Sequence, residues 1–458
     1  MSGFPKPLSP APSKTMRFST LSRGALASVK ELVAALTLAF VAVLGPTGCG
    51  LLSKDTQEVV VIPPTPVGLT AGFSLGSGVR TLSFGPGDKS SPRVKPSGDS
   101  VAFILDGYAV EKPLYTQDFR RRTASNFGAE SAEWLPDGSL AVSASENGTK
   151  TQNMETTPAL SSLFVAPPDD YSSIRKFDER IGATGAAPGS QAVFAAVVTS
   201  PTRDSPEEPL RSRPVLLWGS EEPTKVYLEN IEGYVTGLSV SPDGSQIVLA
   251  VRHDKDEMGG RSREEQGTSR YEIQVHRFSE GLASRVANLP EGMEVMGSPQ
   301  VTSGGVYFVA SRGDTADVEH NRDTTSYALY RVPEGSDTPE LVRSVGEGFV
   351  ASSISVSPDG GRLAVLGRRN PGSSTNLYVL DLASDTLGVA TANQNMEIKT
   401  NPRDLAWFPN GRSVVLVARG AFSGPEVYDG PAKSLSSAFY NLYEVPVEGL
   451  SGRRGSEG

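Results

Sequence analysis

The six residues SVSPDG occur twice in the chain, at Ser239–Gly244 and at Ser355–Gly360. An apolar run follows each copy, SQIVLAV after the first and GRLAVLG after the second. Serine and proline suit the first two positions of a type I turn, aspartate tolerates the third, and glycine accepts the left-handed conformation that follows. With strand-like residues on both sides, the motif predicts a tight hairpin turn between two β-strands.

Weaker copies of this motif recur along the chain. They read VKPSGDSVAFI (Val94–Ile104), WLPDGSLAVSA (Trp134–Ala144), AAPGSQAVFAA (Ala186–Ala196), SPQVTSGGVYFVA (Ser298–Ala310) and WFPNGRSVVLV (Trp407–Val417). Aligned on their prolines, the copies fall at Pro96, Pro136, Pro188, Pro242, Pro299, Pro358 and Pro409. The sequence is therefore a series of seven units, each about 50 residues long.

Each unit also contains strand-like segments after the hairpin, such as YEIQVHRFSEG (Tyr271–Gly281) and NLYVLDLAS (Asn376–Ser384). A further short apolar segment follows in all but the last unit, which gives four strands per unit. Repeats of this length with four strands are the sequence signature of a β-propeller, in which a ring of sheets buries the faces that one sheet alone would expose.

The last unit ends after its third strand, at Asn441–Val447, so its fourth strand has to come from elsewhere. The segment VRTLSFG stands before the first unit and has no partner there. The predicted fold is therefore all-β, a seven-bladed β-propeller of four-stranded antiparallel blades, with the last blade closed by the N-terminal strand Val79–Phe84.

The N-terminal region has the pattern of an export signal. Basic residues precede the apolar run LVAALTLAFVAVL at Leu32–Leu44, and Cys49, the only cysteine of the chain, follows. This arrangement resembles a bacterial lipoprotein signal, in which the cysteine is lipidated; an ordinary signal peptide with a chance cysteine is the alternative. We therefore expect a signal peptide at 1–48, a lipidated tether at 49–78, the propeller at 79–450 and a disordered tail at 451–458. The expected location is extracytoplasmic, with Cys49 anchored in a bacterial membrane.

In the SPDG copies, the turn is followed by two variable residues and then by two aliphatic residues. These copies resemble the WD-repeat-like blades of TolB and its relatives. TolB belongs to the Tol–Pal system of the cell envelope, and similar blades form the propeller of prolyl oligopeptidases. The resemblance spans roughly Val79–Leu450 and implies the fold rather than a function, because the fold carries both enzymes and scaffolds.

Charge and motifs exclude several functions. The formal net charge is −9 and no basic stripe is present, which argues against nucleic-acid binding. The three histidines have no spacing typical of a metal site, and no glycine-rich phosphate loop occurs, so no metal or cofactor is expected.

The connections between the second and third strands of the units are the long ones. They cover about 145–161, 200–213, 253–270, 312–325, 368–375 and 419–438. In an up-and-down blade these connections emerge on one face, where repeat proteins place their binding loops. The candidate binding-face residues are His253, Asp254, Asp256, Arg261, Arg312, Asp314, Asp317 and His320.

The sequence thus predicts a protein-binding or scaffold module of the bacterial cell envelope with a protein partner of unknown identity. The alternative is a propeller enzyme, or a glycan- or small-ligand-binding protein, with its site at the central channel. That alternative requires carboxylates or histidines from several first strands. The clearest first strands supply none, and Glu133 and Asp404, which lie near such strands, are isolated.

Overall fold

The computed structural model describes residues 74–83, 87–116, 118–124, 127–135, 137–144, 161–168, 174–186, 195–199, 211–218, 224–227, 231–253, 270–277, 283–311, 327–342, 345, 348–370, 372–420 and 439–449. The named secondary-structure elements of this part are all β-strands. Within the same residues, no helix has the length and apolar character needed to cross a membrane.

In the described part of the chain, four of the six sheets contain four antiparallel strands in sequence order. The first is β2 (Lys89–Val94), β3 (Ser100–Leu105), β4 (Tyr108–Pro113) and β5 (Arg120–Arg121). The others are β14 (Tyr234–Val240), β15 (Gln246–His253), β16 (Arg270–Arg277) and β17 (Ala283–Asn288); β18 (Val295–Thr302), β19 (Gly305–Ser311), β20 (Tyr327–Pro333) and β21 (Glu340–Leu341); and β22 (Val350–Val356), β23 (Arg362–Arg368), β24 (Asn376–Asp381) and β25 (Thr386–Val389).

The fifth sheet joins the two ends of the propeller sequence. Its order is β1 (Arg80–Thr81), β29 (Asn441–Pro446), β28 (Ser413–Arg419) and β26 (Glu397–Ile398), and β27 (Leu405–Trp407) also pairs with β28. Arg80 lies opposite Glu444, and the Leu82 amide donates to the Leu442 carbonyl at 2.8 Å. The predicted partner of the N-terminal strand is thus confirmed, although the strand itself is shorter than Val79–Phe84.

Packing against the propeller begins before the expected boundary at residue 79. Ser74 forms a β-bridge with Gln394, and Leu75 is buried in the core of the fifth sheet. The segment from Ser74 therefore belongs to the folded part of the chain, because its backbone bonds and its leucine are both used there.

The sixth sheet has eight strands: β6 (Ala129–Trp134), β7 (Leu140–Ala144), β8 (Ser161–Ala166), β9 (Arg175–Ala186), β10 (Ala195–Thr199), β11 (Arg211–Trp218) and β12 (Thr224–Tyr227), with β13 (Ile231–Glu232) beside β11. The long strand β9 is shared. Its first part pairs with β8 and its second part with β10, and Ile181 lies opposite both Ser161 and Thr199.

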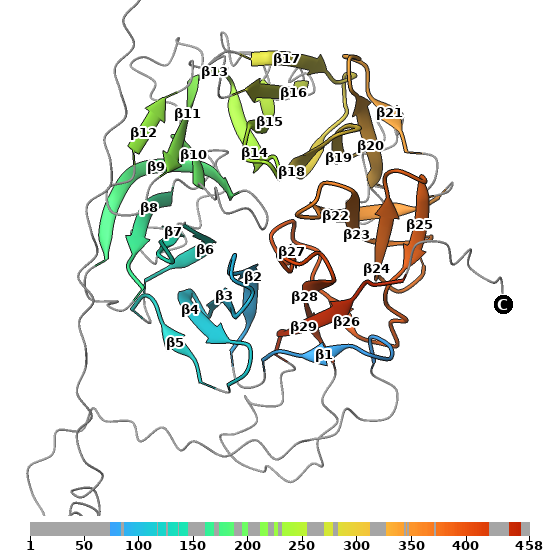
Figure 1. Ribbon diagram of the computed structural model, residues 1–458. Helices are drawn as coiled ribbons and strands as arrows, with labels where there is room; N and C mark the ends of the chain where they lie inside the picture. The colour runs from blue at the N-terminus through green and yellow to red at the C-terminus, as the bar shows by residue number, and fades with distance from the viewer. Residues whose placement is uncertain are drawn as a thin grey trace, which may run out of the picture. The chain divides into compact units, whose positions relative to one another are not determined.

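Strands of neighbouring sheets, with β9 from within the sixth sheet, follow one another in a circle. β2 contacts β6, β6 contacts β9, and the series continues through β14, β18, β22 and β27 back to β2. Figure 1 shows β2, β6, β14, β18, β22 and β27 near the centre, and strands such as β5, β12, β17 and β25 at the outside. The described part of residues 64–458 is therefore a β-propeller of antiparallel, four-stranded blades.

The SPDG turns have the predicted geometry. The Gly244 amide donates to the Ser241 carbonyl at 2.9 Å, and the Gly360 amide donates to the Ser357 carbonyl at the same distance. Both glycines have positive φ, 73° and 70°. Burial alone would raise the pKa of Asp243, but hydrogen bonds from Ser241 and from residue 245 lower it overall. The motif is therefore a self-contained turn, as its composition indicates.

In one repeat copy the proline does not mark the hairpin turn. Pro299 lies inside β18, and the turn to β19 is instead closed where Thr302 pairs with Gly305. The pairing of β18 with β19 is interrupted between Met296 and Gln300. A proline has no backbone N–H to donate, and it is tolerated at such a bulge because the ladder of hydrogen bonds is already broken there. The turn of the Pro188 copy lies outside the described residues, and on either side of it Ala186 pairs with Ala195.

Candidate functional site

Four inner strands share a bulge at a similar place. In β6, β9, β14 and β22 the register with the next strand skips a single residue, and the extra residues are Glu130, Gly182, Thr236 and Ser352. A bulge bends its strand and re-aims a side chain. In the fifth sheet the same place is occupied by residues 399–404, between β26 and β27, which carry Arg403 and Asp404.

Small residues beside these bulges meet the next blade. The Ser91 hydroxyl donates to the Glu130 carbonyl at 3.3 Å, and the Ser353 hydroxyl donates to the Pro402 carbonyl at 3.4 Å. Gly237 occupies the corresponding position in β14, where a Cβ atom would lie only 2.2 Å from the Gly297 carbonyl oxygen. At Gly237 the inner strands therefore approach too closely for a larger side chain.

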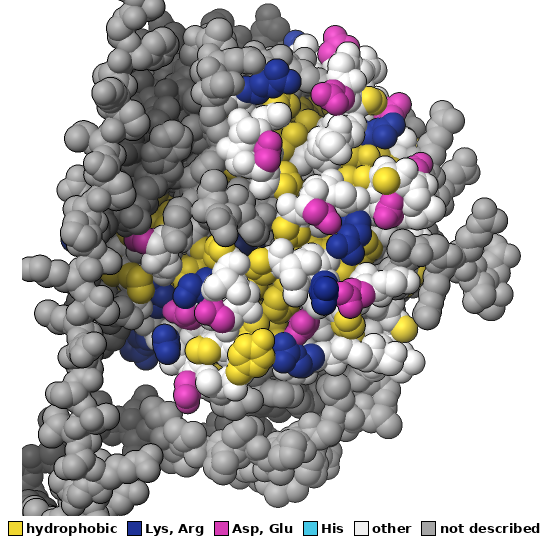
Figure 2. Space-filling view, in the orientation of Figure 1, with side chains coloured by type: hydrophobic (Ala, Val, Ile, Leu, Met, Phe, Trp, Pro, Cys, Tyr) yellow, Lys and Arg dark blue, Asp and Glu magenta, His cyan; other side chains and the backbone are white. Residues whose placement is uncertain are grey.

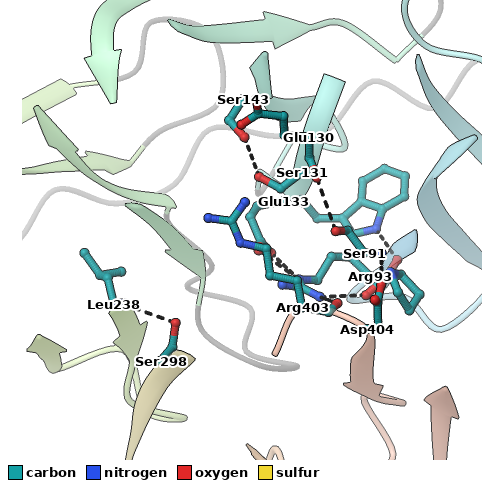
Figure 3. A network of polar contacts seen from close by, with 12 residues as sticks. Ser91, Arg93, Glu130, Ser131, Glu133, Ser143, Leu238, Ser298, Arg403 and Asp404 are labelled. Carbon is teal, nitrogen blue, oxygen red and sulfur yellow. Dashed lines mark hydrogen bonds and ion pairs between the residues drawn. The ribbon is translucent and has the colours of Figure 1, made fainter. Parts of the chain in front are cut away.

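A polar network links three blades at this level (Figure 3). Arg93 of β2 donates from Nε to both carboxylate oxygens of Glu133 in β6, each at 2.8 Å. Its Nη1 donates to the Arg403 carbonyl at 2.9 Å, and the Ser91 amide donates to Asp404 Oδ1 at 2.6 Å. Glu133 and Asp404, which lie near first strands in the sequence, are thus parts of one network.

Burial shapes the charges of the network. Asp404 is 1% exposed, and this burial raises the pKa of its carboxyl although Lys399 Nζ lies 3.6 Å from Oδ2. Burial also lowers the pKa of Arg403, and repulsion from Arg93 adds to the effect, against the attraction of Glu133 and other nearby carboxylates. For both groups, burial therefore disfavours the charged form.

A second cluster begins at Lys399. Its ammonium lies 5.3 Å from the ring centre of Tyr440, whose hydroxyl donates to Glu397. Arg419 Nε donates to Glu397 Oε2 at 2.6 Å. Burial, together with the bond to Glu397, raises the pKa of Tyr440 to about 12. The tyrosine is consequently a hydrogen-bond donor rather than a base at neutral pH.

Lys89 is a buried cation in the neighbouring blade. It is 1% exposed, and its Nζ donates to the Gly87 carbonyl at 2.8 Å. Burial lowers its pKa to about 8, against the attraction of Asp106 and Asp88. Perturbed groups gathered at an inner strand often mark a functional site, but paired charges that join structural elements perturb pKa values as well.

The charges of this network are mostly compensated. The acidic side chains bound in it, Glu133 and Asp404, come from two blades, and each has a cationic partner. Within the residues that the structure describes, no three histidine, cysteine, aspartate or glutamate side chains are grouped so that they could hold a metal ion. Holding neighbouring blades together is the chemistry that this arrangement supports most directly.

Of the predicted binding-face residues, the structure describes His253, at the end of β15. Its Nε2 lies 3.0 Å from Glu272 Oε1, and about a third of its side chain (33%) is exposed. Burial would raise the pKa of Glu272, but hydrogen bonds from His253 and Gln274 lower it overall. Asp254, Asp256, Arg261, Arg312, Asp314, Asp317, His320 and the lipidation candidate Cys49 lie outside the described residues.

Two cavities lie away from the network. One of about 850 Å³ is lined mainly by polar side chains of two neighbouring sheets, among them Gln246, Arg277, Glu334 and Asp337. The other, of about 460 Å³, lies beside β24 and β25, and its lining includes Arg369, Asn370 and Gln394. Figure 2 shows acidic and basic side chains interspersed over the visible described face.

Comparison with known proteins finds similar solved structures. An oligogalacturonate lyase from Vibrio parahaemolyticus is 12% identical with a TM-score of 0.48, over 82% of this chain and 96% of that one. The propeller domain of the Trilobed protease from Pyrococcus furiosus is 14% identical with a TM-score of 0.46, over 78% and 95%. A putative TolB from Agrobacterium tumefaciens is 12% identical with a TM-score of 0.38, over 80% and 94%. No protein-family model and no curated protein matches the chain. The assignment of the fold as a β-propeller rests on the strand pairings of this structure and not on its similarity to these proteins.

Proposed function

We propose that the protein is a membrane-anchored, extracytoplasmic β-propeller that acts as a protein-binding or scaffold module in the bacterial cell envelope. The observation that supports this proposal is the distribution of connection lengths. Residues 145–160, 254–269, 312–326 and 420–440 each join a second strand to a third, whereas the SPDG turns close in four residues. Long loops on one face of a rigid ring are the usual arrangement of a binding surface.

The proposed ring has seven blades. In this interpretation the eight-stranded sheet is two blades that share β9, because its first part completes the blade of β6–β8 and its second part begins the blade of β10–β12. The bulge at Gly182 supports this division, since the same bulge occurs in the first strands β6, β14 and β22.

The proposed anchor is lipid on Cys49. Replacing Cys49 by alanine should abolish incorporation of labelled palmitate and should move the protein from the membrane to the soluble fraction. A Cys49→Ala protein that still incorporates the label would contradict the anchor and leave the binding-face proposal standing.

The binding face is tested by removing loops. Replacing residues 254–269 and 312–326 by short glycine–serine linkers should abolish capture of the envelope partner while the urea unfolding midpoint stays unchanged. The matched control replaces Ser336, Asp337 and Thr338, which follow β20 in the turn to β21 on the opposite face. This control should retain capture, and undiminished capture by the protein without both loops would refute the proposal.

The enzyme alternative has less support. A catalytic site at the ring centre needs acidic groups that are free to exchange protons with a substrate. Both oxygens of Glu133 accept from Arg93, and Asp404 Oδ1 accepts from the Ser91 amide. Asp404 Oδ2 is buried without a hydrogen-bond partner in the described structure, and the Lys399 ammonium lies 3.6 Å from it.

A further inference from the structure

Arg403 carries a guanidinium group that has no hydrogen-bond partner in the described structure. Its backbone carbonyl accepts a bond from Arg93, but its side chain donates none to a described residue. Figure 3 shows Arg403 beside Arg93 and Glu133 with no bond drawn from the guanidinium. The side chain is half-buried at the level of the bulges, where Thr236 is exposed, so solvent reaches this inner level of the ring.

Three carboxylates, Glu133, Glu130 and Asp404, attract the Arg403 guanidinium without forming a hydrogen bond with it, and two of them are bound to other partners. Both oxygens of Glu133 accept from Arg93, and Asp404 accepts from the Ser91 amide and lies beside Lys399. Burial and the repulsion of Arg93 outweigh the attraction of Glu133, Glu130 and Asp404 and lower the pKa of Arg403. The guanidinium therefore lies in an environment that would be improved by another negative charge.

Hydroxyl groups occupy the corresponding positions in the two neighbouring blades. Counted back from the hairpin turn, Ser90 of β2 and Ser352 of β22 stand at the position of Arg403, and both are half-buried. Neither hydroxyl is bonded to another described residue. One cation and two hydroxyl donors thus come from three consecutive blades.

We propose that Arg403 binds a small oxyanion, a carboxylate or a phosphate, at the inner edge of the ring between β22 and β2. A guanidinium donates two parallel hydrogen bonds to such an anion, and a charge-assisted pair of this kind is strong when water is partly excluded. The site is independent of the proposed loop face, because none of its residues belongs to the long connections.

The test uses isothermal titration calorimetry on the full chain in detergent, with citrate and inorganic phosphate as probes at constant ionic strength. Wild-type protein should bind at least one probe saturably, and R403Q should bind it at least tenfold more weakly. The matched control is R331Q, which removes an arginine paired with Glu340 at the outer part of a blade. Binding of citrate alone identifies a carboxylate site, and binding of phosphate alone identifies a phosphate site.

Thermal unfolding without ligand separates binding from structure. R403Q should unfold at or above the wild-type temperature, because the variant no longer carries a charge that burial disfavours. A lower unfolding temperature for R403Q would assign the guanidinium a structural role and overturn the proposal. The proposal also fails if neither probe binds saturably to the wild type, or if R403Q and wild type bind equally.

Discussion

Replacing Arg122 by methionine should destabilise the contact between the first two blades strongly. Arg122 Nη1 lies 2.6 Å from Glu111 Oε2, and the two side chains are only 3% and 6% exposed. Nη2 donates to the carbonyls of Gly138 and Ala166 at 3.0 and 3.1 Å, and both acceptors belong to the sheet of β6–β8. The guanidinium thus neutralises a buried carboxylate of one blade while it bonds the backbone of the next.

The size of the destabilisation follows from the groups that lose a partner in R122M. Glu111 would remain buried with the Ser100 hydroxyl, 2.9 Å from Oε1, as its remaining side-chain donor, and two carbonyls would lose their donor. Removing one partner of a buried ion pair lowers the free energy of unfolding by about 3–5 kcal/mol. The double variant E111M/R122M removes both charges and should recover most of this loss, because an apolar replacement of a buried pair is often neutral or stabilising.

Urea unfolding at pH 7, followed by tryptophan fluorescence and circular dichroism, measures the effect through the midpoint at constant m-value. The exposed pair Arg331–Glu340 supplies the control, since R331M should change the free energy of unfolding by less than about 1 kcal/mol. If R122M shifts the midpoint no more than R331M does, or if the double variant is less stable than R122M, the reasoning is refuted.

Three further results are expected. Trp407→Phe removes an indole N–H bond of 2.8 Å to the neighbouring blade and should lower the free energy of unfolding by about 1 kcal/mol in urea titrations. Gly237→Ala should destabilise the protein by about 1–3 kcal/mol or more, because its Cβ would meet the Gly297 carbonyl, whereas Gly361→Ala, with ordinary contacts, should lower the unfolding temperature much less. Burial raises the pKa of Asp404 in the folded protein above its value in the unfolded chain. The contribution of Asp404 to the free energy of unfolding therefore falls as the pH rises from the unfolded pKa to the folded one. Asp404→Asn should remove this pH dependence of the urea midpoint and should be more stable than the wild type at pH 7.

The repeat and its hairpins could be predicted from the sequence because their determinants are local. Proline, aspartate and glycine encode the turn at Ser241–Gly244 by themselves, and the same bonds recur at Ser357–Gly360. The pairing of the N-terminal strand with β29 was also predictable, because the last unit lacks a strand and only one unpaired segment remains. At Pro299 the motif predicted a turn at the wrong place, because a proline inside a bulge cannot be distinguished in the sequence from a proline in a turn.

The polar network could not be predicted from the sequence, because ring closure creates it. Arg93 and Arg403 are separated by most of the propeller sequence, yet a hydrogen bond of 2.9 Å joins them. The bulges also escape pattern reading, since each adds one residue to a strand without changing its composition. Aligning the positions that precede each hairpin would have shown that Arg403 stands at the position that Ser352 and Ser90 occupy in their own units.

Site-specific photo-crosslinking tests the central claim, that one face of the propeller binds a partner, most directly. A photoreactive residue is placed in cells either at Asn370, exposed in the connection from β23 to β24, or at Asp337, exposed after β20 on the opposite face. The account predicts a discrete protein adduct from position 370 and none from position 337. Adducts of equal yield from both positions, or from position 337 alone, would contradict it.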